Sequence, residues 1–197
     1  MPVHFKKKLS TDDLRRFEHA LGFHELGMDR EALQSLQEMS SETDGELPVV
    51  LLQGQILISL HQFEKAVLLL APAVAANPCH PELIVLLAYA TRRAQSLNEA
   101  YAILEKAVQL FPREAIIQYN FACYCAQRGE EKNALAFLRK AVKLDGQTAQ
   151  LAQNDEDFQP LRNNPDFAKI LQSGPGKTRF PGNCPQGEEE TEIPDTA

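Results

Sequence analysis

A fixed spacing of 34 residues runs through most of this chain and limits the folds open to it. Alanine recurs at this spacing, and a leucine follows each alanine by four residues. The four pairs are Ala32 and Leu36, Ala66 and Leu70, Ala100 and Leu104, and Ala134 and Leu138. Small residues at one fixed phase mark places where two helix backbones approach closely, so the spacing predicts a stack of similar units.

Three further columns keep the same spacing. Two consist mainly of small residues, and the third holds residues that stop helices. They are Ala20, Gly54, Ala88 and Ala122; Met39, Ala73, Ala107 and Ala141; and Asp44, Pro78, Pro112 and Gly146. The columns define four copies, at about 13–46, 47–80, 81–114 and 115–146. Four copies exceed the roughly three that a stacked fold needs for a stable shared core.

Each copy is predicted to be a helical hairpin. In the third copy Pro81 suits the first position of a helix, and Ser96 with Glu99 forms a capping-box pattern that opens a second one. Gly27 and Gly129 suit the turns inside their hairpins. The expected helix pairs span 11–26 and 29–41, 47–60 and 62–76, 81–95 and 96–111, and 114–127 and 130–144.

This pattern resembles the tetratricopeptide repeat, a helix–turn–helix unit of 34 residues. The family's motif of bulky and small residues is matched most clearly in the third and fourth copies. The matching residues are Leu87, Ala88, Thr91, Ala100, Leu104, Ala107 and Pro112, then Phe121, Ala122, Cys125, Ala134, Leu138, Ala141 and Gly146. The resemblance implies an all-α, right-handed solenoid over residues 11–146. The first copy departs most, with Arg16 and His19 at bulky apolar positions, as expected for a terminal repeat.

The chain outside the repeats is predicted to form three segments. Residues 1–10 are expected to be a flexible N-terminus. Residues 147–172 keep apolar side chains without the period, so we expect short helices there that cap the stack. Their DEDFQPLRNNPDF stretch resembles the ends of many bacterial repeat proteins of this family, which suggests a bacterial source. Residues 173–197 combine Pro and Gly with a run of glutamates, which is typical of a disordered acidic tail.

Composition excludes several classes of partner. The net charge is −7 and the pI is near 5.3, so no basic field attracts nucleic acid. No apolar run is long enough to span a membrane, and residues 1–8 do not resemble a secretory signal, so we expect a cytoplasmic protein without membrane contact. All four cysteines are expected to be reduced.

The sequence shows no constellation for catalysis or for a cofactor. SGPGKT at 173–178 ends like a phosphate-binding loop, but the first glycine is replaced by Leu171 and no strand precedes the run. Cys79 and His80 are adjacent, which does not make a four-ligand metal site. We therefore predict no enzyme activity, no cofactor, no metal and no nucleotide.

The remaining candidate site is the inner wall of the superhelix, which in this family is lined by the first helix of each unit. The predicted peptide-binding residues mix apolar, aromatic and polar side chains: Leu51, Gln55, Ile58, Val85, Tyr89, Arg92, Arg93, Tyr119, Asn120, Cys123 and Gln127. Tyrosine and arginine are enriched at interaction sites because they combine large contact area with polar tips. The clamp that some relatives use for a C-terminal carboxylate is absent, because Glu82 and several leucines occupy its positions.

Two functions remain open at this point. The first is a protein-interaction module, of adaptor or chaperone-like type, that binds a peptide segment of a partner protein in its concave groove as a monomer or weak homo-oligomer. The second is a structural subunit or scaffold of a larger complex or homo-oligomer, which would use its convex or terminal faces.

Overall fold

The structure, a computed structural model, describes residue 5 and residues 9–173, and within these every regular element is a helix. The first eight α-helices form four successive pairs, and a short 3-10 helix, η1 (Ser41–Thr43), follows the first pair. The pairs are α1 (Thr11–Glu25) with α2 (Asp29–Gln37), α3 (Leu47–Ser59) with α4 (Phe63–Ala76), α5 (Pro81–Ala94) with α6 (Leu97–Leu110), and α7 (Ala115–Gln127) with α8 (Glu131–Leu144).

These helices lie within one residue of the expected ranges, except that α2 ends at Gln37 instead of residue 41. The earlier end has a physical cause at the base of the first pair. The Ser40 backbone N–H and hydroxyl both donate to the Asp13 carboxylate, at 2.9 Å each, and this draws the chain away from the helix axis. Asp13 is buried and also accepts a hydrogen bond from Ser10, so it joins the start of α1 to the end of α2.

The repeated small residues lie between the helices of each pair. The alanines of the first column are fully buried, as is Leu70. A Cβ added to Gly54 would lie 2.9 Å from Cδ2 of Leu70, so α3 and α4 approach too closely for a larger residue. This close approach is the reason for the 34-residue spacing in the sequence.

Three of the four turns inside the pairs share one backbone conformation at a fixed repeat position. Gly27 and Gly129 have φ angles of 73° and 75° at this position, which agrees with their predicted place in the turns. His61 occupies the same position in the second pair with a φ of 57°, which costs a non-glycine residue free energy. In the third pair Gln95 has a φ of −126°, so this turn takes another path.

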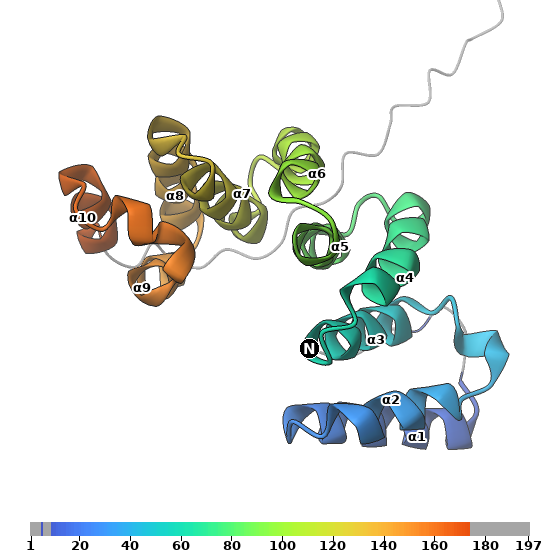
Figure 1. The fold of residues 1–197 in the computed structure, drawn as a ribbon. Helices are drawn as coiled ribbons and strands as arrows, with labels where there is room; N and C mark the ends of the chain where they lie inside the picture. Colours follow the sequence, from blue (N-terminus) through green and yellow to red (C-terminus); the bar gives the residue numbers. More distant parts are fainter. Residues whose placement is uncertain (1–4, 6–8, 174–197) are drawn as a thin grey trace, which may run out of the picture.

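The pairs stack along a curved path that runs from α1 and α2 to α7 and α8 (Figure 1). Each first helix contacts the first helix of the next pair: α1 contacts α3, α3 contacts α5, and α5 contacts α7. The first helices therefore line one continuous surface of the stack, which we call the inner surface. The fold is the expected all-α solenoid of stacked helical hairpins.

The C-terminal segment caps the stack, as the sequence predicted. It consists of α9 (Gln147–Asn154), a 3-10 helix η2 (Glu156–Leu161) and α10 (Pro165–Gln172). α10 packs on α8 and α9, while η2 packs on α7. Phe158 and Leu161 of η2 are fully buried, and they join Phe167 and Ile170 of α10 in the core cluster that also contains the fourth pair. The apolar side chains of η2 and α10 thus close the carboxy-terminal end of the stack.

Some expectations fall outside the described residues. These are most of the flexible N-terminus proposed for residues 1–10 and all but Ser173 of the proposed acidic tail. The Phe5 ring is described and lies 5.2 Å from that of Phe17. The expectation that all cysteines are reduced is wrong for Cys79, which is disulfide-bonded and lies exposed in the turn between α4 and α5. Cys123 and Cys125 are buried free thiols, and Cys184 lies outside the described residues.

Candidate functional site

All eleven predicted groove residues lie on the first helices α3, α5 and α7. Because they follow the 34-residue spacing, they fall into columns that cross the inner surface from one helix to the next. The columns include Leu51, Val85 and Tyr119; Gln55, Tyr89 and Cys123; Ile58 and Arg92; and Arg93 and Gln127. The apolar members on α3 and α5 are half-buried, whereas Gln55, Tyr89, Arg93 and Gln127 are exposed.

Part of this surface is already occupied by the chain's own cap. The Arg92 guanidinium donates two hydrogen bonds to the Asp157 carboxylate, with N–O distances of 2.6 and 2.8 Å. The Tyr119 hydroxyl donates to Asp155 at 2.7 Å, and the Gln127 amide donates to the backbone oxygen of Asp157 at 2.9 Å. The structure therefore brings predicted groove residues together around an internal segment at the fourth pair.

The apolar side of the same contact is aromatic. The Phe158 ring is fully buried and packs edge-on against Tyr119, with 5.7 Å between ring centroids. This occupant was not predicted. The available signal was the apolar residues of 147–172 next to Asp155 and Asp157, which pointed to a cap without showing which helices it would cover.

Burial and hydrogen bonding set the protonation of this contact. The hydrogen bond to Asp157 raises the pKa of Arg92. Burial, followed by the hydrogen bond to Asp155, raises the pKa of Tyr119, which keeps its hydroxyl a donor. Burial also raises the pKa of Cys123 well above its usual value, and its Sγ lies 3.7 Å from Asp155. The thiol is neutral and poorly nucleophilic at neutral pH.

Cys123, Asp155 and Asp157 are close enough together to be considered as metal ligands, since their ligand atoms lie within 4.8 Å of one another. The donor set does not fit that role. Both Asp157 oxygens accept from Arg92, and the Asp155 oxygens accept from Tyr119 and from the Asp157 backbone N–H. A metal would also require the Cys123 thiolate, which burial disfavours. The cluster serves to hold the cap.

An aromatic group lies at the open part of the surface, on α5 and the start of α4. Tyr89 is 38% exposed, and its ring packs against Phe63 with centroids 6.4 Å apart. The Arg93 guanidinium lies over the other ring of this pair, 4.9 Å from the centre of Phe63. Asn120 is less available, because its amide donates to the backbone oxygen of Ile116 at 2.8 Å.

Three further apolar residues lie in inner-surface columns, in addition to the eleven predicted peptide-binding residues. Leu14 and Ile116 share one column and are both 41% exposed, and Leu21 shares the column of Tyr89 and is 37% exposed. The signal was present, since the 34-residue spacing itself places them there. The first copy departs from the repeat pattern at Arg16 and His19, and this makes the inner-surface role of Leu14 and Leu21 harder to recognise.

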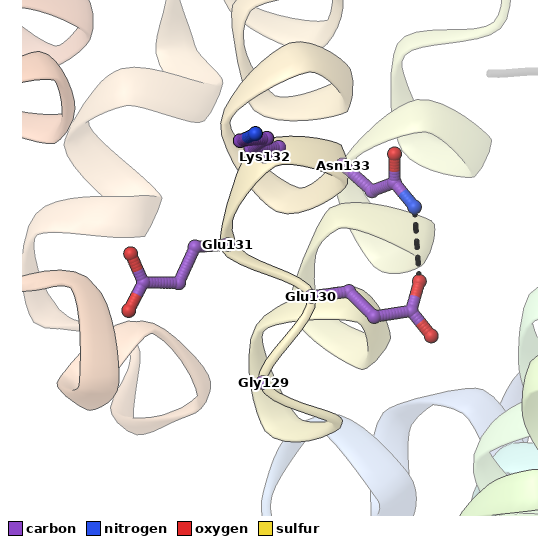
Figure 2. Close-up of a pocket in the computed structure, with 5 residues that line it drawn as sticks. All are labelled: Gly129, Glu130, Glu131, Lys132 and Asn133. Atoms are coloured by element: carbon purple, nitrogen blue, oxygen red, sulfur yellow. Dashed lines mark hydrogen bonds between the residues drawn. The ribbon is translucent and has the colours of Figure 1, made fainter.

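A separate hollow of about 510 Å³ lies beside the turn between α7 and α8, lined by residues 129–133 (Figure 2). Its carboxylate, Glu130, is already bound by Arg128 at 3.0 Å, Asn133 at 3.0 Å and the Tyr101 hydroxyl at 3.2 Å. Glu131 and Lys132 point away from Glu130 (Figure 2). Because Glu130 and Asn133 are already hydrogen-bonded to each other, the hollow does not support a binding site.

The sequence comparison identifies the family in the fourth pair. Residues 115–148, which form α7 and α8 with the following turn, match the model of the tetratricopeptide repeat. This pair is a tetratricopeptide repeat, and the stack has the fold of proteins built from such repeats. The other three pairs of this tetratricopeptide stack repeat the same packing, with their column alanines in the same buried positions.

Solved structures show the same tetratricopeptide fold. A thermophilic protein of this type, TTC0263 from Thermus thermophilus, is 19% identical with a TM-score of 0.62, over 72% of this chain and 80% of that one. A MamA protein is 13% identical with a TM-score of 0.60, over 81% of this chain and 86% of that one. The MamA RS-1 ArsTM double mutant is 19% identical with a TM-score of 0.59, over 74% of this chain and 79% of that one. No curated protein matches the chain in sequence. These identities show the fold alone.

Proteins built from tetratricopeptide repeats are in general interaction modules without catalytic activity. Within the part of the chain that the structure describes, no helix is both long and apolar enough to cross a membrane. The candidate nucleotide loop at 173–178 falls outside the described residues except for Ser173.

Proposed function

We propose that this protein is a non-catalytic interaction module, of adaptor or chaperone-like type, that binds a peptide segment of a partner protein on its inner surface. One observation carries the proposal. The chain's own segment Asp155–Phe158 lies on α5 and α7, held by Arg92, Tyr119 and Gln127. This contact supports the idea that the inner surface is suited to a polypeptide, because it uses bidentate, amide and aromatic contacts at once.

The same contact limits where a partner can lie. Since η2 covers α7, the accessible part of the inner surface extends over α1, α3 and α5. Its proposed contact residues are Leu21, Leu51, Gln55, Ile58, Val85, Tyr89 and Arg93. A partner that contacts Arg92, Tyr119, Cys123 or Gln127 would have to displace the cap. A partner that binds the Asn120 amide would have to break its hydrogen bond to the backbone oxygen of Ile116. We therefore place the main anchor at Tyr89.

The proposal is tested on partners recovered from the native host with the full-length chain. Each partner's Kd is measured for the wild type and for Tyr89→Ala. Tyr89 is exposed and supported by Phe63, so its loss is expected to cost about 2 kcal/mol, or roughly 30-fold in Kd. Leu68→Ala is the control, because Leu68 is 76% exposed but belongs to the second helix α4. Partners that lose affinity with Leu68→Ala and not with Tyr89→Ala would contradict the proposal.

A structural or scaffold role is the second candidate, and exposed leucines on second helices favour it. Leu68 on α4 and Leu110 on α6 are both mostly exposed and available for contact with another subunit. Sedimentation of the purified chain at micromolar concentration separates the two roles. A monomer favours the peptide site, whereas a tight oligomer that Leu68→Ala dissociates favours the structural role.

A further inference from the structure

Among residues 9–173, negative charge is concentrated in the part of the stack where the inner surface is open. Residues 9–94 contain twelve Asp and Glu against six Lys and Arg, whereas residues 95–173 contain ten against nine. The first group covers α1 to α5, which are the helices that the cap leaves accessible. Charge and accessibility therefore coincide in one part of the stack.

Three of these carboxylates lie in columns of the inner surface. Glu18 and Glu25 are on α1, in the columns of Asn120 and Arg93, and Glu82 is on α5, in the column of Ile116. All three are exposed, and none forms a hydrogen bond or ion pair with another residue that the structure describes. They are available to cations of a binding partner.

Only one described cation of the same surface, Arg93, remains to offset these carboxylates. Arg92 is neutralised by its bidentate pair with Asp157. Arg93 lies over the Phe63 ring, so it is the one inner-surface arginine on the described helices α1 to α5 that has no carboxylate partner. An incoming acidic segment would meet Glu18, Glu25 and Glu82, and of the described inner-surface arginines only Arg93 would be open to pair with it.

Apolar side chains lie among these carboxylates. Leu14, Leu21 and Tyr89 expose between 37% and 41% of their surface, and the half-buried Leu51, Ile58 and Val85 lie between them along the stack. Such a surface favours a partner that supplies aliphatic side chains for contact and positive charge at the edges.

Building on the proposed function, we propose that the partner segment is basic and rich in aliphatic residues. Its aliphatic side chains pack on Leu21, Leu51, Val85 and Tyr89. Its Lys or Arg side chains pair with Glu18 and Glu25 at the α1 end and with Glu82 on α5. The charge selects among partners and speeds encounter, while the apolar contacts supply most of the affinity.

Selection from a library of random 12-residue peptides on the full-length chain tests this proposal. We expect the enriched peptides to contain more Lys and Arg than Asp and Glu, together with Leu, Ile, Val or Phe. Their affinity is expected to fall as NaCl is raised, because exposed charges are screened. The triple variant Glu18→Gln, Glu25→Gln and Glu82→Gln should weaken binding about 10-fold at low salt.

The matched control removes the same charge elsewhere. Glu31→Gln, Glu42→Gln and Glu64→Gln alter three exposed carboxylates outside the first helices, so affinity should stay close to that of the wild type. Equal losses in both triple variants would overturn the inference.

The outcomes separate this inference from the function on which it rests. An acidic or neutral pool whose binding is lost with Tyr89→Ser would overturn the basic-partner inference and leave the peptide site standing. No enrichment, or a pool that binds Tyr89→Ser and Leu21→Ser as well as the wild type, would overturn both.

Discussion

Arg92 of α5 and Asp157 of η2 form a bidentate ion pair across 65 residues of sequence, with N–O distances of 2.6 and 2.8 Å. The pair joins the inner surface of the third helix pair to the cap behind the fourth. Its side chains are 22% and 24% exposed, so the contact is partly shielded from water. It turns the cap into part of the inner surface.

The strength of this pair is measurable in a double-mutant cycle with Arg92→Gln and Asp157→Asn. We expect a coupling energy of about 1–2 kcal/mol in urea unfolding, because charge-assisted hydrogen bonds exceed neutral ones and the pair is mostly shielded. A coupling energy near zero would show that the cap is held by its other contacts, among them buried Phe158 and the Tyr119–Asp155 hydrogen bond.

Alanine substitutions at two glycines of first helices should change stability differently, because one glycine has open space around it and the other is tightly packed. Gly22 of α1 has open space around a new Cβ, so Gly22→Ala should raise the free energy of unfolding by about 0.5–1 kcal/mol. Gly54→Ala adds a Cβ 2.9 Å from the fully buried Leu70, and we expect it to be about 1–3 kcal/mol less favourable than Gly22→Ala. Equal effects in thermal or urea unfolding would mean that α3 and α4 can separate freely.

The left-handed backbone of His61 should make His61→Gly stabilising, by up to about 1 kcal/mol, because glycine adopts this conformation without a steric penalty. Gln95→Gly is the control at the same repeat position, where φ is −126° and no such gain is available. Urea unfolding of both variants checks the difference. A loss of stability in His61→Gly would indicate that the His61 ring, 5.6 Å from Phe63, contributes more than the backbone costs.

Acid should weaken the first helix pair through Asp13. The backbone N–H of Ser40, followed by the Ser10 hydroxyl, lowers the pKa of Asp13 below 3.8. A lowered pKa means that the stabilisation is present above the unfolded-state pKa and is lost as pH falls through the folded-state pKa. Asp13→Asn should therefore be less stable than the wild type at pH 7. The difference should shrink as pH falls below about 4, as unfolding curves at several pH values would show.

The 34-residue spacing made the helix pairs predictable because it records a physical requirement that recurs in every pair. Ala32, Ala66, Ala100 and Ala134 are fully buried where two helices meet, and a larger residue at any of them would disturb the same contact. The end of α2 was not predictable in this way. It depends on hydrogen bonds from Ser40 to Asp13, and no other pair repeats this arrangement at the described positions.

The polar contacts of the inner surface could not be predicted from periodicity. Tyr119 and Arg92 were singled out for a partner's peptide, yet their present partners are Asp155 and Asp157 of the same chain. Such contacts depend on how a non-repetitive segment folds back. The peptide-binding role of the eleven residues stays a prediction, and so do the bacterial source and the cytoplasmic location.

The way η2 is held also restricts how the molecule can lengthen. Its contacts require an arginine on one first helix and a tyrosine on the next, at positions that only α5 and α7 supply among the described helices. A duplicated hairpin inserted after α8 would separate the cap from both. A hairpin inserted ahead of α1 would leave every cap contact intact. The number of repeats can therefore change at the amino-terminal end, whereas the contacts of η2 with α5 and α7 fix it at the carboxy-terminal end.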